Sequence, residues 1–284
     1  MKRILVPLLG QSGDRSALDA ASAIAKRNGA HIEARLFQRS PQDSIPIVGE
    51  GFSAAMVEQV MDAARKSADK QTDSVKANFE AWVQADAIAW GPPKEGSEVT
   101  ADLETEVGPI PGTALPYMRV ADLVVLARPM AQGQPDRSSL LEAAMMDSGR
   151  PVLLVPDDGT VTKAETVIVA WNGAAEAARA VSVAMPVLKA AKSVTVVTVR
   201  DDTQTVRPHD LVDTLSMNRI AAKAVLRDAA KAGIAAAIDE EAAKVNADLI
   251  LIGAYSHSRF REFIMGGVTD DMLNAFGVPV LMVH

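Results

Sequence analysis

A glycine-rich segment near the carboxyl end of the sequence has the residue types of an anion site. The stretch IGAYSHSRFREFIMGGVTDDM, residues 252–272, places Gly266 and Gly267 directly before an apolar helical pattern. Glycine lets the backbone approach a ligand closely, and the free amides and dipole of a helix start attract phosphate. Together with the hydroxyl of Thr269, these residues form a candidate phosphate pocket.

The same residues also allow a purely structural interpretation, in which Gly-Gly is only a tight connection. Asp270 and Asp271 lie in the first predicted helical turn, where carboxylates complement the dipole and would repel a phosphate. Arg259 and Arg261 could compensate this charge, although Arg261 lies beside Glu262 and also fits a solvated surface. A bare Gly-Gly before a helix therefore does not establish a ligand site.

Motifs for catalysis or metal binding do not emerge from the sequence. His257 lies between Ser256 and Ser258, but no carboxylate to orient the imidazole and no oxyanion hole can be identified. The chain has no cysteine and only four scattered histidines, and it contains neither G-x-x-x-x-G-K-[ST] nor G-x-G-x-x-G. We therefore expect no catalytic residues, no metal centre and no enzyme activity.

The amino-acid composition and net charge of the chain limit the kinds of partner that it can bind. The chain has 284 residues, 48 % of them hydrophobic, and a formal net charge of −7. A negative charge argues against binding to nucleic acid or to an anionic membrane surface. No apolar run reaches the length of a membrane span, and polar residues from Gln11 to Asp14 interrupt the apolar start too early for a signal peptide. We expect a cytoplasmic protein whose partners are small molecules or other proteins.

An internal repeat divides the chain. The run ADLVVLA at 121–127 matches ADLILIG at 247–253, and both halves open and close with similar apolar segments. The repeat predicts a tandem duplication with domains at 1–157 and 163–284, joined by the linker PDDGTVTK at 156–163.

Each half alternates short apolar runs with helical patterns. Uninterrupted apolar strands are typical of parallel sheets that helices cover on both faces, with ligands beyond the carboxyl ends of the strands. Strands are predicted near 3–9, 31–37, 99–107, 122–128, 151–155, 166–171, 194–200, 220–226, 248–253 and 279–283. Helices are predicted near 14–28, 53–85, 111–119, 138–148, 174–191, 208–216, 234–246 and 267–276. The expected fold is α/β, with two tandem flavodoxin-like (Rossmann-like) doubly wound domains, each with a mostly parallel five-stranded sheet.

The repeat, the glycine-rich loop and the closing GVPVLMVH together resemble the universal stress protein family in its tandem two-domain form. Nucleotide-binding members of that family carry the pattern G-2x-G-9x-G-(S/T) at this position. Here Gly253, Ser256, Gly266 and Gly267 keep the complete spacing, while two residue types are altered. The resemblance covers nearly the whole chain and is strongest at 247–284.

The resemblance implies an adenine-nucleotide site in the second half. Asn172 replaces an aspartate that helps to hold the adenosine, and its amide can bond a base or ribose but is a poorer cation ligand. Ser256 adds a Cβ near the phosphates, and Gly267 lacks a hydroxyl that Thr269 partly replaces. The implied site comprises Ala170, Asn172, Val199, Ile252, Gly253, Ser256, Gly266, Gly267, Val268 and Thr269.

The first half departs further from the family pattern. Leu9 replaces the polar anchor, and the loop RPMAQGQPDRSS is two residues shorter, with Pro129 and Pro135 removing backbone donors and two serines aligned with Gly-Gly. We therefore expect no nucleotide site of the family type in this half. In the preceding segment GQSGDRSA, Ser12 is predicted to cap a helix whose start is near Asp14.

Two other features have structural and functional interpretations. Trp171 ends the first strand of the second half, where it could cover an adenine or, as large apolar rings do more often, plug a pocket. The long helical pattern at 54–86 is predicted to pack across its own domain rather than to form a coiled coil, because its apolar stripe weakens within three heptads.

The resemblance implies a non-catalytic stress-response protein that binds ATP or another adenine nucleotide, with Mg²⁺ as a companion of the nucleotide, and acts as a sensor or regulator. A nucleotide-free scaffold of the same fold is the alternative, favoured by Leu9, Asn172, Ser256 and Gly267. A slow nucleotide hydrolase is a weaker one, since no general base is evident. Family members pair through their last strands, so the resemblance implies an internal pseudo-dimer. We also expect a homodimer of whole chains and an unidentified protein partner.

Overall fold

The structure, a computed structural model of the chain, describes residues 1–44, 54–94, 96, 98–129, 134–158, 162–200, 207–228, 233–254 and 276–284. Its strands are β1 (Arg3–Leu8), β2 (His31–Gln38), β3 (Ala89–Trp90), β4 (Thr100–Val107), β5 (Leu123–Ala127), β6 (Val152–Val155), β7 (Thr166–Ala170), β8 (Ser193–Arg200), β9 (Ala222–Asp228), β10 (Leu249–Gly253) and β11 (Val280–Val283). Its helices are α1 (Asp14–Asn28), η1 (Pro41–Ser44), α2 (Ala54–Ala85), α3 (Leu115–Val120), α4 (Pro135–Met146), α5 (Ala175–Ala190), α6 (Pro208–Met217) and α7 (Ile234–Lys244).

The described strands form one sheet in the order β3-β4-β2-β1-β5-β6-β11-β10-β7-β8-β9. Every described strand pair is parallel except β6 with β11. The order β4-β2-β1-β5-β6 of the first half corresponds to β9-β8-β7-β10-β11 of the second, as a duplication requires. The predicted α/β class and doubly wound halves are confirmed, with one difference: the two-residue strand β3 adds a sixth strand to the first half.

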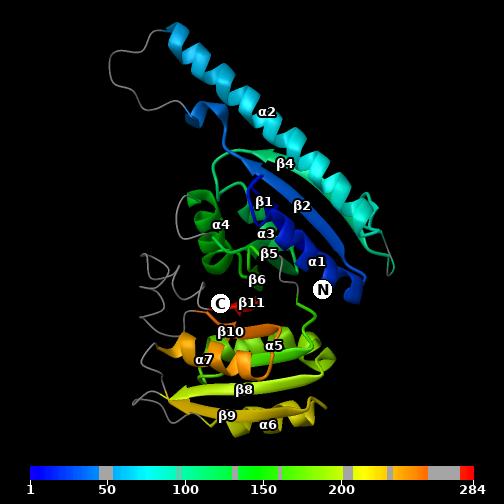
Figure 1. Cartoon of the computed structure of the whole chain (residues 1–284), viewed down its shortest axis with the longest axis vertical. Coiled ribbons are helices and arrows are strands. Elements are labelled where there is room, and N and C mark those ends of the chain that lie inside the picture. The colour runs from blue at the N-terminus through cyan, green and yellow to red at the C-terminus, as the bar shows by residue number, and fades with distance from the viewer. Residues whose placement is uncertain are drawn as a thin grey trace.

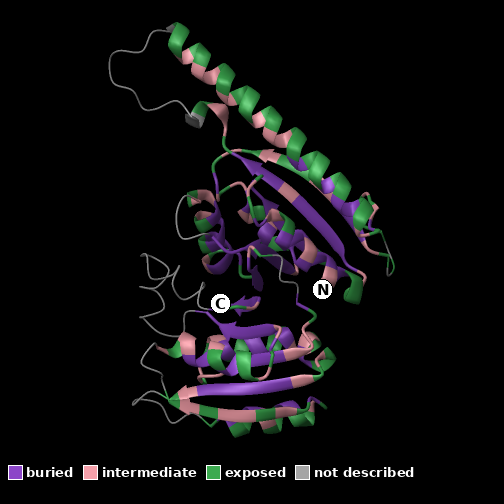
Figure 2. Cartoon of the chain, in the orientation of Figure 1, coloured by how far each residue is buried: buried purple, intermediate pink, exposed green. Residues whose placement is uncertain are grey.

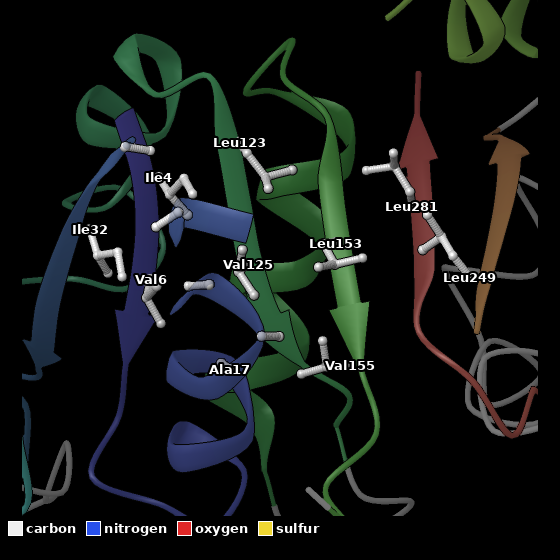
Figure 3. Packing of buried hydrophobic residues seen from close by; sticks show 14 of the residues in the cluster. Ile4, Val6, Ala17, Ile32, Leu123, Val125, Leu153, Val155, Leu249 and Leu281 are labelled. Atoms are coloured by element: carbon white, nitrogen blue, oxygen red, sulfur yellow. The ribbon is translucent and has the colours of Figure 1, made fainter. Parts of the chain in front are cut away.

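Alternating side chains of the strands build two apolar layers, one on each face of the sheet. The first core cluster lies under α1, α2, α5 and α6, and Figure 3 shows part of it. Its members include Ile4, Val6, Ile32, Val125, Leu153, Val167, Leu249 and Leu281. The second core cluster lies under α3, α4 and α7, and it includes Leu5, Val124, Leu126, Leu154, Ile168, Ile250 and Phe276. Coverage on both faces explains why these strands read as continuous apolar runs.

The closing strands join the two halves. β6 pairs with β11 in antiparallel register, with Leu153 opposite Leu281, and both side chains are buried in the first core cluster. In Figure 1 the two strands lie at the centre of the molecule, between the halves. The internal pairing through the last strands, which the family resemblance implied, is thus confirmed.

Arg128 adds a polar contact between the halves. Its guanidinium follows β5 and donates hydrogen bonds to the backbone carbonyls of Phe276 and Val278, which precede β11. Burial lowers the pKa of Arg128 to about 10, while Asp158 and Asp239 favour its charged form. The side chain therefore remains protonated near neutral pH and satisfies carbonyls at the junction.

Helix α2 follows the sequence prediction only in part. Its carboxyl-terminal half packs on the sheet through Val75, Phe79 and Trp82, and the Trp82 indole donates to Asp19 at 2.9 Å. Toward its amino-terminal end, apolar side chains such as Val57 are only half-buried. Figures 1 and 2 show this end of α2 extending past the sheet with much of its surface exposed. Among the helices of the described ranges, none combines the length and apolar composition needed to span a bilayer.

A charged cluster lies on the sheet where β1 and β2 run side by side. Glu33 of β2 accepts hydrogen bonds from Arg3 at 2.5 Å and from Arg35 at 2.6 Å, and its side chain is 3 % exposed. Arg35 also bonds Glu106 at 2.6 Å and lies over the Tyr117 ring at 3.9 Å. Burial alone would raise the pKa of Glu33, but the two arginines outweigh it and hold the pKa below its usual value.

We predict a specific acid sensitivity from this cluster. Because the folded-state pKa of Glu33 lies below the ordinary value of 4.5, its ionisation stabilises the fold above pH 4.5, and this contribution is lost as pH falls through the folded-state pKa. The Glu33→Gln variant should be less stable at neutral pH and should show a shallower loss of stability below pH 4.5. Urea unfolding across this range checks it, with Glu58→Gln on the exposed side of α2 as control. If the unfolding free energy falls equally steeply with decreasing pH in wild type and in Glu33→Gln, the stabilising role of ionised Glu33 is contradicted.

Gly253, at the end of β10, has a structural reason to be glycine. A Cβ added there would lie 2.3 Å from the Ala177 backbone nitrogen and 2.5 Å from the Glu176 carbonyl carbon. These are backbone atoms of α5, so a side chain at position 253 would push the helix away from the sheet. The close approach of α5 to β10 therefore depends on this glycine.

The Gly253→Ala variant should accordingly lose about 1–3 kcal/mol of unfolding free energy through overpacking. Gly277→Ala is the matched control, because a Cβ there would meet nothing within 4 Å. This control should change stability by no more than about 1 kcal/mol. Chemical denaturation of both variants measures the difference, and equal stabilities would show that α5 can shift freely.

Candidate functional site

Four of the predicted site residues converge at the carboxyl ends of three adjacent strands. Ala170 ends β7, where it pairs with Ile252 of β10 on one side and with Val197 of β8 on the other. Gly253 follows Ile252, and Val199 lies near the end of β8. The chain leaves β7 toward β8 on one side and returns in β10 on the other, so this edge is the topological switch point of the second half.

The side chains of Ala170, Val199 and Ile252 share one face. All three belong to or pack against the second core cluster, on the side that α7 covers. Ile252 is buried, whereas Ala170 and Val199 are partly exposed. They form an apolar wall that suits the flat face of a ring.

Trp171 lies on the opposite side from this wall. Its ring packs against the first core cluster, and its carbonyl accepts a hydrogen bond from the Thr198 hydroxyl at 2.8 Å. Successive side chains of an extended chain point to opposite faces, so a ring next to Ala170 points away from Ala170's neighbours. The packing of Trp171 on the core therefore favours its structural interpretation.

Asn172 shapes the turn between β7 and α5. Its Oδ1 accepts a hydrogen bond from the Ala174 amide at 3.1 Å, and Ala174 is the N-cap residue of α5. This is an Asx turn, in which the side chain replaces a backbone acceptor. The oxygen expected to contact a base or ribose thus also has a local partner.

The remaining predicted residues cannot be placed at this edge. Ser256, Gly266, Gly267, Val268 and Thr269 lie outside the described residues, and so does the helix expected at 267–276 apart from Phe276. The described part of the loop ends at Ala254. Across the described ranges, no group of three or more His, Asp or Glu side chains is arranged to hold a metal ion.

The equivalent edge of the first half is filled by a carboxylate of the chain itself. Asp14 Oδ2 accepts hydrogen bonds from the amides of Leu9 at 3.0 Å, Gly10 at 2.8 Å and Gln11 at 3.3 Å. We call these three donors the turn amides. Amides in a turn before a helix are the donors that bind phosphate in many proteins, so Asp14 occupies an anion position.

The helix cap predicted at Ser12 is wrong. The N-cap position of α1 is Gly13, with φ of 87°, and no side chain caps the helix there. A left-handed backbone favours glycine, and a Cβ at position 13 would lie 2.6 Å from the Ala127 side chain and 2.7 Å from Arg137 Nη1. The turn is therefore too tight at this point for a residue with a side chain.

Arg137 provides the positive charge for this internal anion. Its Nη2 donates to Asp14 Oδ1 at 3.0 Å and to the Ser12 carbonyl at 2.6 Å, and the side chain is 3 % exposed. Burial raises the pKa of Asp14, while Arg137 and the turn amides favour its ionised form. The sequence pattern placed the start of α4 near residue 138, but α4 begins at Pro135 and so includes Arg137 in its first turn.

Gln71 of α2 contacts the same edge of the sheet, at the ends of β1 and β2. Its Nε2 donates to the Leu9 carbonyl at 2.6 Å, and its Oε1 accepts from Gln38 Nε2 at 2.9 Å. The only sequence signal for this role is a polar residue one turn before Val75 on the inner stripe of α2. These contacts give a physical reason to expect no family-type nucleotide site in the first half.

Comparison with known proteins relates the second half of the chain to a family by sequence and the whole chain to solved structures by fold. A sequence model of the universal stress protein family matches residues 163–284, and no curated protein matches the chain. A universal stress protein from Archaeoglobus fulgidus DSM 4304 has a similar structure, with a TM-score of 0.68 and 16 % identity over 99 % of this chain and 95 % of that one.

Two solved structures from Pseudomonas aeruginosa also match. A functionally unknown protein from strain PAO1 gives a TM-score of 0.55 at 15 % identity, over 100 % of this chain and 92 % of that one. A putative universal stress protein from strain UCBPP-PA14 gives 0.54 at 15 % identity, over 100 % and 93 %. At these identities the likeness concerns the fold, which extends over both halves. Residues 163–284 thus match the universal stress protein family in sequence, and the whole chain is similar in fold to a universal stress protein.

Proposed function

We propose that the protein is a non-catalytic, cytoplasmic stress-response protein that binds an ATP-like adenine nucleotide in its second half and acts as a sensor or regulator. The observation that carries this proposal is the convergence of Ala170, Val199, Ile252 and Gly253 at the switch point of the half that the family model matches. The base would lie against the apolar wall. The phosphates, with any Mg²⁺, would lie toward the loop whose spacing the sequence keeps.

The difference between the halves supports this location. In the first half, Asp14 holds the turn amides. At the start of α5 the acidic residue of the first turn is Glu176, which pairs instead with Arg179 at 3.0 Å. Within the described contacts, the turn after β7 therefore has no counterpart of the Asp14 carboxylate. In the described contacts, a phosphate approaching this turn would therefore displace no carboxylate from its amides, as it would have to displace Asp14 in the first half.

A nucleotide-free scaffold is the second candidate, and two observations favour it. Asn172 Oδ1 already accepts a hydrogen bond from Ala174, and Gly253 is required by the packing of α5 whether or not a ligand binds. A scaffold would act through a protein partner or a second copy of the chain. Because β6 and β11 pair with each other inside the chain, a homodimer would have to form through a surface other than these strands.

Calorimetric titration of the full-length protein with ATP, with and without Mg²⁺, tests the proposal. We expect one site per chain. The Gly266→Asp variant should abolish binding, because a carboxylate in the loop would repel the phosphates and be desolvated beside them. Ser138→Asp is the control, since this exposed residue aligns with the Gly-Gly pair in the first half and should leave affinity unchanged.

Two results would contradict the proposal in different ways. Absence of heat at millimolar ATP would favour the scaffold, whereas unchanged affinity in Gly266→Asp would place the site elsewhere. Release of inorganic phosphate from bound ATP, above that of heat-inactivated protein, would instead support a slow hydrolase. We expect no such release.

A further inference from the structure

The first half contains a cavity that begins at the turn holding Asp14 and extends away from the strand ends, between α1 and α2. It lies between the start of α1 and the inner side of α2, and its volume is about 830 Å³. This volume is within the range of small-molecule sites, which is roughly 300–1,000 Å³. We call it the α1–α2 pocket. Its lining comes from the turn after β1, the first turns of α1 and residues 67–81 of α2.

Gln71 lines both this pocket and a second, smaller cavity. This second cavity has a volume of about 250 Å³ and is also lined by Leu9, Phe37 and Gln38, at the ends of β1 and β2. The hydrogen bonds from Gln71 to Leu9 and with Gln38 fix the position of the Gln71 side chain. No residue of β2 or β5 lines the α1–α2 pocket, so it does not correspond to the edge proposed for nucleotide in the second half.

The α1–α2 pocket has an apolar floor and polar walls. The floor is formed by buried side chains of β1, α1 and α2, namely Leu8, Leu18, Val75 and Phe79. The walls carry amide and hydroxyl groups from Gln11, Ser12, Ser67, Ser74 and Asn78. In the described structure Gln11 Oε1 is buried without a hydrogen-bond partner. A buried acceptor without a donor is costly, so rotation of the Gln11 amide toward a donor on a bound molecule would stabilise the complex.

The charge of the lining is positive, in contrast to the chain as a whole. Arg15 and Lys70 are its cations, and Asp14 is its one carboxylate. The Asp14 oxygens, however, are directed to the turn amides and to Arg137. Arg15 Nε forms an ion pair with Asp19 Oδ1 at 2.9 Å on the surface of α1. Lys70 therefore makes the clearest positive contribution at the rim, where it would attract an anion.

We propose that the α1–α2 pocket binds a small amphipathic organic anion, with an apolar ring or chain on the floor, its acidic group toward Lys70 and a hydrogen-bond donor toward Gln11. This activity is independent of the proposed nucleotide site.

Titration of the full-length protein with 1-anilinonaphthalene-8-sulfonate, followed by fluorescence, tests this proposal. The probe has aromatic rings, a sulfonate and an N–H donor, which match the floor, Lys70 and Gln11. Saturable binding should weaken about tenfold in Lys70→Glu and become weaker at high salt, since an exposed charge is reversed. Lys66→Glu is the matched control, because Lys66 is exposed one turn earlier on α2 and does not line the pocket.

Two further measurements locate the binding. Methyl NMR should show probe-induced shifts at Leu8, Leu18 and Val75 and none at Val199 or Ile252, and Ser74→Trp should reduce affinity by filling space. Excess ATP and the Gly266→Asp substitution should leave probe binding unchanged, so that failure of the nucleotide proposal and failure of this one are distinguishable. Equal affinities in wild type, Lys70→Glu and Ser74→Trp, or shifts confined to the second half, would overturn the proposal.

Discussion

The antiparallel pairing of β6 with β11 is the constraint on which the rest of the structure depends. Each half ends in a short, fully buried strand, and an unpaired edge there would expose backbone donors and apolar side chains. Pairing the two strands satisfies both edges and merges the core layers across the junction. The strands within each half are parallel, and this single pairing is antiparallel. The carboxyl ends of the strands in the two halves therefore point in opposite directions along the sheet. The end of β5 therefore lies near the start of β11, which is why Arg128 can reach Phe276 and Val278.

The turn between the first strand and the first helix of each half finds different acceptors for its backbone N–H groups. A turn before a helix presents backbone donors that must find acceptors when water is excluded. In the first half Asp14 supplies the acceptor and Arg137 balances its charge, so the chain contains its own anion. In the second half the described acceptor in the corresponding turn is the neutral side-chain amide of Asn172, whose Oδ1 accepts from the Ala174 amide. A neutral acceptor leaves the local field of the helix start available to a ligand anion.

The sequence predicted the elements better than it predicted the contacts between them. Continuous apolar runs and Ala-rich helical patterns located the strands and the described helices within a few residues, because burial on both faces produces these patterns. The strand β3 was missed because two residues carry no periodicity. The Ser12 cap was wrong because residue type alone does not show that the backbone at Gly13 is left-handed. The roles of Gln71 and Arg137 depend on contacts across more than 60 residues, which local patterns do not contain. Residues 255–275 lie outside the described residues, and the nucleotide proposal takes its phosphate contacts from their sequence spacing.

The first half has a physical reason to remain in the chain that does not depend on a nucleotide site. β11 carries Leu281 and Val283 into the first core cluster, and β6 covers the edge of the sheet beside them. Without the first half, this edge and the carbonyls that Arg128 bonds would have to be satisfied by water or by another chain. The first half therefore replaces the partner subunit that a single domain would need. Because β6 and Arg128 secure that structural role, other parts of this half can vary without exposing the junction. These parts include the α2 residues that line the α1–α2 pocket.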